Sequence, residues 1–335
     1  MKRTHCCGQL GREQIGQEVS LCGWVNSYRD HGNLVFVDLR DRSGLVQVVF
    51  DPECDAESHR LARGLRCEWV IACEGKVRPR GEGLENPKLA TGEIEVIVHR
   101  LTILNTAKTP PFDLDNAEQV NEELRLEYRY IDLRRRAMQH RLEVRHRTTK
   151  LVRDYFDRHG FWEIETPMLA KSTPEGARDF LVPSRLCKGM FYALPQSPQL
   201  FKQILMASGC ERYFQIVRCF RDEDPRADRQ AEFTQIDVEM SFASADDVIT
   251  LNERLIAEIF KTILDVDVPL PIPRMKYEQA MAEYGIDRPD LRFEMKLKDI
   301  SDIAAASAFK VFSEAVHKGG IVKGLCAPGG GRYSR

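Results

Sequence analysis

The chain has 335 residues, and its 49 Lys and Arg against 51 Asp and Glu give a formal net charge of −2. This balance excludes a global basic field, so any site for a polyanion must come from local patterning. With 43% hydrophobic and 30% charged residues, the composition is that of a folded protein. No run approaches the roughly 18 consecutive apolar residues of a membrane span, and the N-terminus lacks a signal-peptide core. We therefore expect a cytoplasmic protein that contacts no membrane.

The first hundred residues contain five segments rich in β-branched and aromatic residues, separated by turn signals. Strands are expected at 19–26, 34–39, 45–50, 69–77 and 94–104, with a helix at 56–65. Five strands with a helix between the third and the fourth is the order of an OB-fold barrel, which binds oligonucleotides on the face of strands 2 and 3. Without motifs, this order alone does not establish the fold.

The rest of the chain alternates helical and strand patterns. Residues 105–121 contain Thr109-Pro110-Pro111 and little periodicity, which is typical of an interdomain linker. Helical spacing begins near Glu122, is broken near the triple arginine and ends at Gly160. Further elements are expected as strands at 161–165, 189–194, 213–221 and 233–242 and as helices at 197–208 and 245–264. In the last strand, the alternation places Asp237 and Glu239 on one face and apolar residues on the other.

Two charged segments could bind phosphate. Residues 125–153 contain ten Lys and Arg against three Asp and Glu, which is either a basic stripe beside a polyanion or a solvated helix face. Residues 220–233 form a loop of alternating acids and arginines between two apolar strands. Arginines clamp phosphate oxygens and carboxylates hold Mg²⁺, so this loop suits a triphosphate. A surface network of salt bridges is the alternative.

A small zwitterion could be held by a second group of residues. Ser197 is expected to cap a helix with Pro198 in its first position, which places Gln199 and Lys202 on one helix face. Together with Glu175, they offer a carboxylate, an amide and an ammonium. Taken singly, Ser197 is explained by capping alone and Lys202 by a surface position.

These segments together resemble the bacterial-type aspartyl-tRNA synthetases, a family of class II aminoacyl-tRNA synthetases. The resemblance rests on CGWVN (22–26), DLRDRSGLVQVVFDP (38–52), ATGEIEV (90–96), RYIDLRR (129–135), ETPMLAKSTPEGARDFLVPS (165–184), FYALPQSPQLFKQ (191–203) and FRDEDPRADRQAEFTQIDVE (220–239). It implies a multi-domain chain, with an all-β OB-fold anticodon-binding barrel followed by a partial α+β class II catalytic domain built on an antiparallel sheet with helices. The expected ranges are 1–105 for the barrel, 106–123 for a linker, 124–272 for the catalytic domain with motifs 1 and 2, and 273–335 for the start of an α/β insertion domain.

The resemblance also implies the reaction and its residues. Aspartate and ATP would form aspartyl-adenylate, and the aspartyl group would pass to the 3′ end of tRNA(Asp). Arg221 matches the motif 2 arginine, the expected catalytic residue that bridges the α-phosphate and the aspartate carboxylate. The expected aspartate-binding residues are Glu175, Ser197, Gln199, Lys202 and Arg221. The expected ATP-binding residues are Arg221, Asp222, Glu223 and Gln230. The acidic face of Asp237 and Glu239 is expected to face the site.

Nothing before Arg335 matches motif 3, the glycine-rich strand and helix that closes the family's active site, so we expect an N-terminal portion of a synthetase. Mg²⁺ is expected with its ligands beyond residue 335. The long helix with residues 161–167 resembles motif 1, which implies a homodimer.

On the barrel, the resemblance implies anticodon contacts from Arg29, Phe36, Gln47 and Glu93. Phe36 would stack on a base, although its alternating strand also fits a core position. His31 and the glycine-rich run with Gly83 resemble family members that also charge tRNA(Asn). Two alternatives stay open, namely a truncated tRNA-binding module that makes no adenylate, and a class II relative specific for asparagine or lysine.

Overall fold

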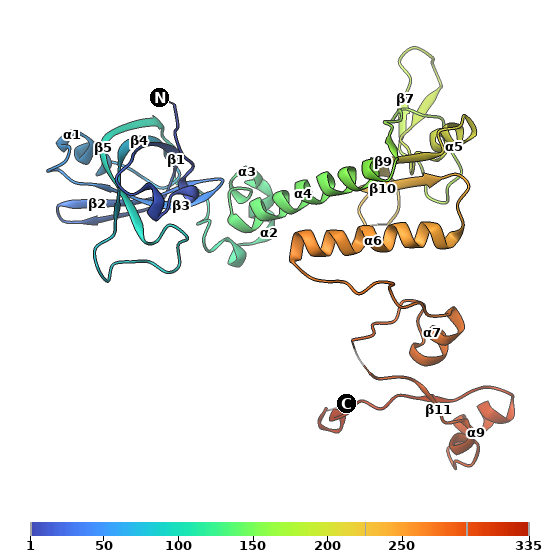
Figure 1. The fold of residues 1–335 in the computed structure, drawn as a ribbon. Coiled ribbons are helices and arrows are strands. Elements are labelled where there is room, and N and C mark those ends of the chain that lie inside the picture. The colour runs from blue at the N-terminus through green and yellow to red at the C-terminus, as the bar shows by residue number, and fades with distance from the viewer. Residues whose placement is uncertain (1, 225, 293, 334–335) are drawn as a thin grey trace. The chain divides into compact units, whose positions relative to one another are not determined.

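The computed structural model describes residues 2–224, 226–292 and 294–333 (Figure 1). They form two compact units, Met1–Arg147 and Thr148–Arg335, and each is described by itself. Pro225, in the expected triphosphate loop, and Arg335, the end of the expected insertion domain, lie outside the described residues.

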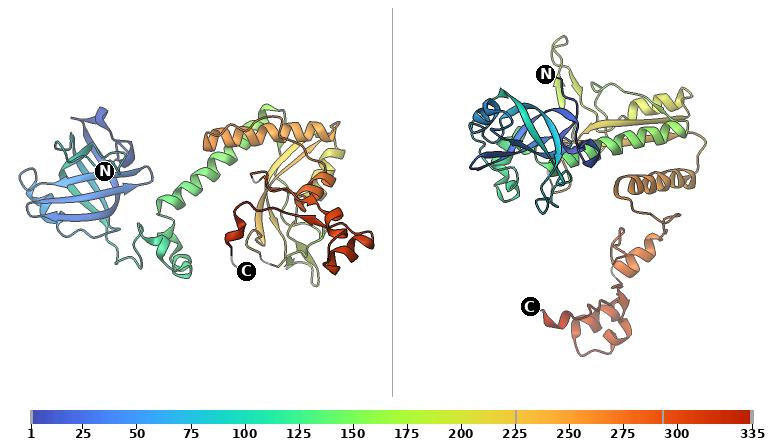
Figure 2. Two further views of the ribbon diagram at one scale, coloured as in Figure 1. Left: turned by 90° about the horizontal axis from the view of Figure 1, so that it is seen from below. Right: turned by 60° about the vertical axis from the view of Figure 1, so that its left-hand side comes forward.

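Five strands of unit 1 close into a barrel in the order β1-β2-β3-β5-β4, seen in two further directions in Figure 2. The strands are β1 (Glu18–His31), β2 (Leu34–Asp41), β3 (Gly44–Phe50), β4 (Val70–Pro79) and β5 (Ile94–Asn105). Helix α1 (Ala56–Ala62) lies between β3 and β4, and its N-cap Asp55 accepts a hydrogen bond of 2.7 Å from the Ser58 backbone N–H. The barrel closes through the parallel pairing of β3 with β5. The predicted OB-fold order is confirmed.

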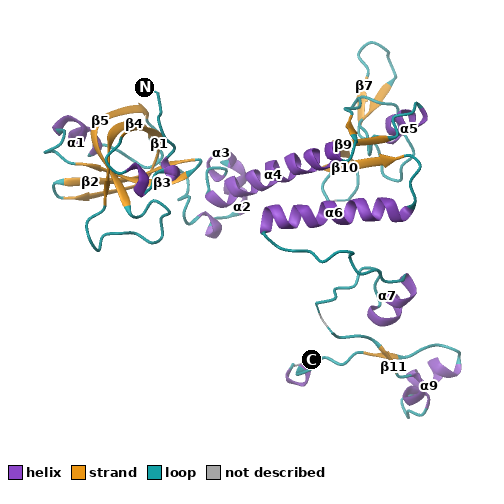
Figure 3. Ribbon diagram, viewed as in Figure 1, coloured by secondary structure: helices purple, strands orange, loops and turns teal. Residues whose placement is uncertain are grey.

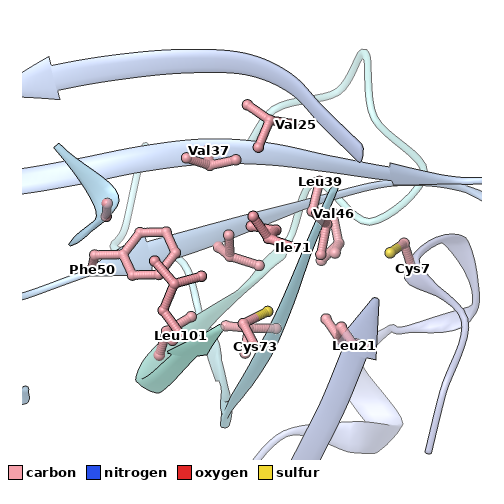
Figure 4. Close-up of a cluster of buried hydrophobic side chains, with 14 of the residues drawn as sticks. Cys7, Leu21, Val25, Val37, Leu39, Val46, Phe50, Ile71, Cys73 and Leu101 are labelled. Atoms are coloured by element: carbon pink, nitrogen blue, oxygen red, sulfur yellow. The ribbon is translucent and has the colours of Figure 1, made fainter. Parts of the chain in front are cut away.

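The barrel core follows from the alternation of side chains along the strands. In β2, Val35, Val37 and Leu39 are fully buried, while the residues between them are half-buried on the outer face. Figure 4 shows how these side chains meet those of the other strands inside the barrel. Phe36 therefore belongs to the outer face, and the core alternative for this residue is wrong.

Three helices follow the barrel: α2 (Glu122–Glu127), α3 (Arg129–Asp132) and α4 (Arg136–Arg158). The expected interruption at the triple arginine is present, and a second one occurs at Tyr128, whose ψ of 45° leaves the helical range. Glu68, only 6% exposed, accepts hydrogen bonds from Arg40 (2.7 Å) and Arg134 (2.7 Å). This carboxylate therefore ties the barrel to the segment that precedes α4.

Unit 2 is built on a sheet with the strand order β10-β9-β6. Its elements are β6 (Trp162–Glu163), β9 (Arg212–Phe220), β10 (Glu232–Met240) and the helix α6 (Ala245–Leu264). β9 and β10 are antiparallel, but β6 runs parallel to β9, so the sheet is mixed where an antiparallel one was expected. Apolar residues of α4 and α6 cover one face of this sheet, with Phe156 and Phe214 stacked 4.9 Å apart.

The other face of the sheet carries α5 (Gln199–Ala207). A hairpin of β7 (Leu181–Pro183) and β8 (Phe191–Ala193) precedes it. The last elements are α7 (Tyr277–Tyr284), β11 (Lys298–Asp299), α8 (Ser301–Ala305), α9 (Lys310–His317) and β12 (Lys323–Gly324), joined by long loops (Figure 3). In the described parts of the chain, no helix combines the length and the apolar character needed to cross a membrane.

Candidate functional site

The centre of the unit 2 site is an ammonium between two carboxylates. Lys202 Nζ on α5 lies 2.8 Å from Asp237 Oδ1 and 2.9 Å from Glu239 Oε1 on β10. The side chains of Lys202 and Asp237 are only 12% and 11% exposed. Burial lowers the pKa of Lys202, but its hydrogen bonds to the two carboxylates outweigh this and leave the pKa above its usual value. The predicted acidic face of β10 is therefore where this lysine binds.

Asp237 has an unused acceptor. Its Oδ2 atom is buried and has no hydrogen-bond partner among the described residues. A buried acceptor without a donor is costly, which marks the place where a ligand donor fits. Burial raises the pKa of the Tyr213 hydroxyl, and the nearby Asp237 carboxylate raises it further, so Tyr213 stays neutral under this acceptor.

Glu175 is held over the same sheet by two hydroxyl groups. Ser197 Oγ donates to its Oε2 at 2.7 Å, and Thr173 Oγ1 donates to its Oε1 at 2.9 Å. The Ser197 hydroxyl therefore does not cap α5, whose N-cap is Pro198 without a side-chain hydrogen bond. The expectation that Ser197 is the N-cap is wrong, because the hydroxyl is used on a carboxylate 22 residues away in the sequence.

The loop that carries Glu175 is anchored by a residue that sequence reasoning missed. Gln196 is 1% exposed, accepts a hydrogen bond from the Ala177 N–H at 3.1 Å and donates to the Ala177 carbonyl at 3.0 Å. Its amide also donates to Asp179 at 2.5 Å. The sequence around Gln196 does not predict this role, because an amide side chain at the end of a short strand is usually expected on the surface. Gln199 is exposed, and within the described residues no hydrogen bond joins it to Glu175.

The buried thiol of Cys219 is influenced by several of the predicted residues. Cys219 is fully buried on β9, and burial raises its pKa to about 11. The positive charges of Arg221 and Lys202 act on this thiol in the opposite direction. The carboxylates of Asp237 and Glu175 add to the effect of burial. Each of these four charged groups therefore lies near enough to Cys219 to influence its pKa.

Arg221 stands at the entrance of the charged loop. Its guanidinium carbon lies 5.0 Å from the centre of the Phe233 ring and forms no ion pair with any residue of the described ranges. It lines a cavity of about 300 Å³ together with Glu223 and Gln230. A second cavity of about 730 Å³ is lined by Asp222, Glu223 and the residues around Gly176. The loop acids and arginines are exposed, and the pair between Glu223 and Arg229 is long, at 3.4 Å, so most of this charge is available to a ligand.

The barrel carries a separate cavity of about 620 Å³. Arg29, His31, Phe36 and Gln47, all singled out from the sequence, line it. Arg29 donates to the Gln47 side-chain oxygen at 3.2 Å, and Gln47 donates to Glu95 at 2.8 Å. The ring of His31 meets the ring of Phe36 edge-on at 5.8 Å. The cavity thus offers one aromatic surface beside a fixed row of polar groups.

Two of the barrel residues lie elsewhere. Glu93 does not line the cavity, because its exposed carboxylate accepts two hydrogen bonds from Arg12, at 2.6 and 2.8 Å. Glu95 occupies the expected place instead, between Gln47 and Arg78, whose Nε donates to it at 2.9 Å. Gly83 has a φ of +77° in an exposed loop and does not line the cavity either.

The class of protein follows from comparison with known families. The family described as tRNA synthetases class II (D, K and N) matches residues 121–317, and the OB-fold nucleic acid binding domain matches residues 19–104. The chain therefore belongs to the class II tRNA synthetases and carries an N-terminal OB-fold domain. The match begins where the helices after the barrel begin and includes both strands of the site.

Two individual relatives are similar to this chain over its whole length. An aspartate–tRNA(Asp/Asn) ligase of Moorella thermoacetica is 60% identical over 335 residues, and another of Symbiobacterium thermophilum is 59% identical over 336 residues. Both matches include 100% of this chain but only 56% and 57% of those relatives. The chain thus spans about half the length of the curated relatives it matches.

Solved structures agree with the fold. A putative aspartyl-tRNA synthetase from Leishmania major Friedlin matches with a TM-score of 0.70 at 26% identity, over 79% of this chain and 53% of that one. An asparaginyl-tRNA synthetase from Pyrococcus horikoshii, complexed with asparaginyl-adenylate, matches with a TM-score of 0.70 at 24% identity, over 79% of this chain and 59% of that one. The latter identity supports a common fold alone.

Proposed function

We propose that the chain provides the anticodon-binding barrel and part of the catalytic domain of an aspartate–tRNA ligase that charges tRNA(Asp) and tRNA(Asn). The observation that carries this proposal is the lysine held between two carboxylates, Asp237 and Glu239. The similarity to aspartate–tRNA(Asp/Asn) ligases supports it.

The amino acid would be selected by charge. An ammonium has three donors, and Lys202 uses two of them on Asp237 and Glu239, so one is left for the side-chain carboxylate of aspartate. An asparagine amide would bring no charge to this ammonium and would bind less well. The free Oδ2 of Asp237, with Glu175 nearby, would accept hydrogen bonds from the substrate ammonium.

The first reaction step needs no protein nucleophile. An oxygen of the aspartate α-carboxylate attacks the α-phosphorus of ATP, and the bond from this phosphorus to the oxygen that bridges to the β-phosphate breaks. Pyrophosphate leaves with that electron pair. Arg221 presents two parallel donors to the α-phosphate and the attacking carboxylate, so it neutralises charge where charge develops. Asp222, Glu223 and Gln230 line the cavities where the nucleotide would bind.

In the second step, a hydroxyl of the terminal tRNA ribose attacks the aspartyl carbonyl, and AMP leaves. The residues described here would serve this step by positioning the adenylate. The described residues contain no group of three or more His, Cys, Asp or Glu suited to a metal ion, so no step is assigned to Mg²⁺. Mg²⁺ ligands beyond residue 335 stay a prediction.

The barrel would read the anticodon. Phe36 offers a face for a base, and Arg29 and Gln47 offer polar atoms for base edges beside it. His31, in contact with Phe36, is placed to influence which anticodon is accepted. A homodimer through α4 and β6 stays a prediction, supported by the exposure of Leu142 (50%) and Trp162 (68%). The cytoplasmic location likewise stays a prediction.

The test measures aspartate charging of tRNA(Asp) and tRNA(Asn) transcripts by the complete gene product. Arg221→Lys should reduce adenylate formation, measured as aspartate-dependent pyrophosphate exchange, because a point charge replaces a two-donor fork. Charging of tRNA(Asp) alone would remove the dual specificity. The 335-residue chain is assayed beside it. RNA binding without pyrophosphate exchange by this chain would favour the tRNA-binding-module alternative for the chain alone.

A further inference from the structure

A cavity of about 220 Å³ lies in unit 1, and the anticodon proposal does not use it. Its wall comes from the turn between β2 and β3, the loop before β5, the segment after the barrel and the start of α4. It shares no lining residue with the barrel cavity around Phe36. It is therefore a second, separate hollow in the same unit.

The lining of this cavity is strongly cationic. Arg40, Arg42, Lys88, Arg134, Arg135 and Arg136 line it. Three of these arginines are already paired with carboxylates: Arg40 and Arg134 share Glu68, and Arg135 binds Asp132 at 2.9 Å. These pairs build the wall and offer little charge to a ligand.

The other three cations have no partner. Throughout the described ranges, no residue forms a hydrogen bond or an ion pair with the side chains of Arg42, Lys88 or Arg136. Two carboxylates, Asp41 and Asp115, also line the cavity. Asp41 already has partners, because it forms an ion pair with Arg3 at 3.4 Å and accepts hydrogen bonds from the Cys7 N–H (2.9 Å) and from the Ser43 N–H (2.8 Å). Three available positive charges therefore face one available negative charge.

The position of these cations suits an anion. Each comes from a different element, so their charges converge on the hollow and do not lie along one solvated helix face. Arg136 is the first residue of α4, a helix of 23 residues, whose N-terminal end adds a partial positive charge. At about 220 Å³, the cavity is below the roughly 300–1,000 Å³ of sites that enclose a whole small molecule. A phosphate group with its waters fits this size better than a complete nucleotide does.

We propose that this cavity binds a backbone phosphate of tRNA at a point outside the anticodon. The inference rests on the proposed function, because tRNA is the polyanion that the barrel is proposed to bind. A phosphate contact adds affinity and fixes orientation without reading sequence. The basic segment 125–153 thus has two roles in unit 1: Arg134 and Arg135 are structural, and Arg136 contacts the ligand.

The experiment compares two RNAs on the 335-residue chain, whole tRNA(Asp) transcript and its isolated anticodon stem–loop. The variants are Arg42→Gln, Lys88→Gln, Arg136→Gln and the triple combination. Arg60→Gln is the matched control, because Arg60 is an exposed arginine on α1 that does not line the cavity. Affinities are measured between 50 and 200 mM salt, and circular dichroism confirms that each variant is folded.

When a phosphate contact is lost, the slope of log K against log salt falls by about 0.9, which is about a 3.5-fold smaller loss of affinity between 50 and 200 mM salt. Because the proposal places one phosphate among three cations, we expect this full change for whole tRNA in the triple variant and a smaller one in each single variant. Binding of the stem–loop should be unchanged, as should both RNAs with Arg60→Gln.

Three results would overturn the inference. Unchanged binding of whole tRNA by the triple variant would show that no phosphate lies in the cavity. An equal loss for whole tRNA and stem–loop would show a general effect of charge. Binding of millimolar inorganic phosphate to the wild type and not to the triple variant, with tRNA bound equally well by both proteins, would assign the cavity to a free anion. If the wild type fails to bind the stem–loop, the anticodon proposal fails instead, and the two failures are distinguishable.

Discussion

Glu68→Gln should destabilise unit 1 far more than the loss of an ordinary surface ion pair. The Glu68 carboxylate is 6% exposed and accepts hydrogen bonds from Arg40 at 2.7 and 2.8 Å and from Arg134 at 2.7 Å. Glutamine has nearly the same shape, but its NH₂ group would face a guanidinium, and Arg40, 13% exposed, would lose its counter-charge. Removing one partner of a buried pair costs roughly 3–5 kcal/mol.

Partial exposure of the pair to solvent reduces the expected loss of stability. The Arg134 side chain is 31% exposed and can recover water, so we expect a loss of about 2–4 kcal/mol in the free energy of unfolding. Urea unfolding has a slope of about 1–3 kcal/mol per molar, and a slope of about 2 converts this loss into a shift of the midpoint by about 1–2 M. Urea titration followed by tryptophan fluorescence measures it, because Trp24 lies under the Arg134 guanidinium at 5.4 Å.

The matched control is Glu93→Gln, which breaks the pair with Arg12. Their side chains are 54% and 70% exposed, and exposed pairs contribute about 0–1 kcal/mol. If Glu68→Gln moves the urea midpoint no further than Glu93→Gln does, the assignment of Glu68 as the link between the barrel and the following segment is refuted.

Three further predictions concern the sites and the core. Phe36→Ala should weaken binding of the anticodon stem–loop by about 1–3 kcal/mol through lost stacking, while Tyr130→Ala, at a 63% exposed ring outside the cavity, should not; equal effects in a binding titration would contradict the stacking role. Gln196→Ala should speed tryptic cleavage in the loop 170–184, and the exposed Gln203→Ala should not; identical digestion patterns would count against the anchor. Burial raises the pKa of Cys73 to about 12. The contribution of the neutral thiol to the free energy of unfolding is complete below pH 9. It is lost as the pH rises from 9 towards 12, by about 1.4 kcal/mol per pH unit. Cys73→Ala should flatten the alkaline fall of the urea midpoint, and an unchanged fall would refute it.

Local chemistry made several elements predictable. The helix predicted at 245–264 is α6 with the same ends, because Ser244 and Asp247 form a capping box before a regular apolar stripe. The alternation in β10 correctly placed Asp237 and Glu239 on one face. The end of α4 was likewise marked by Gly160, whose φ of +76° favours glycine.

Elements that depend on distant partners were harder to predict. β1 continues to His31, beyond the predicted end at residue 26, because its polar second half pairs with β2 across an irregularity between Val25 and Ser27. From the sequence alone, such polar residues predict a turn. In the same way, the choice between Glu93 and Glu95 depends on which carboxylate faces Gln47, and the use of the Ser197 hydroxyl depends on Glu175. Hydroxyl and carboxylate side chains have many possible partners, and only the folded chain selects one.

Closure of the barrel has a consequence for the proposed binding of RNA. Every strand from β1 to β5 has a neighbour on both sides, so the barrel has no strand with a completely open edge. The pairing of β3 with β5 covers only Val48 to Phe50. The RNA recognition proposed above would depend on the tips of side chains on a fixed scaffold, so exchange of a single side chain would redirect it while the barrel stays the same.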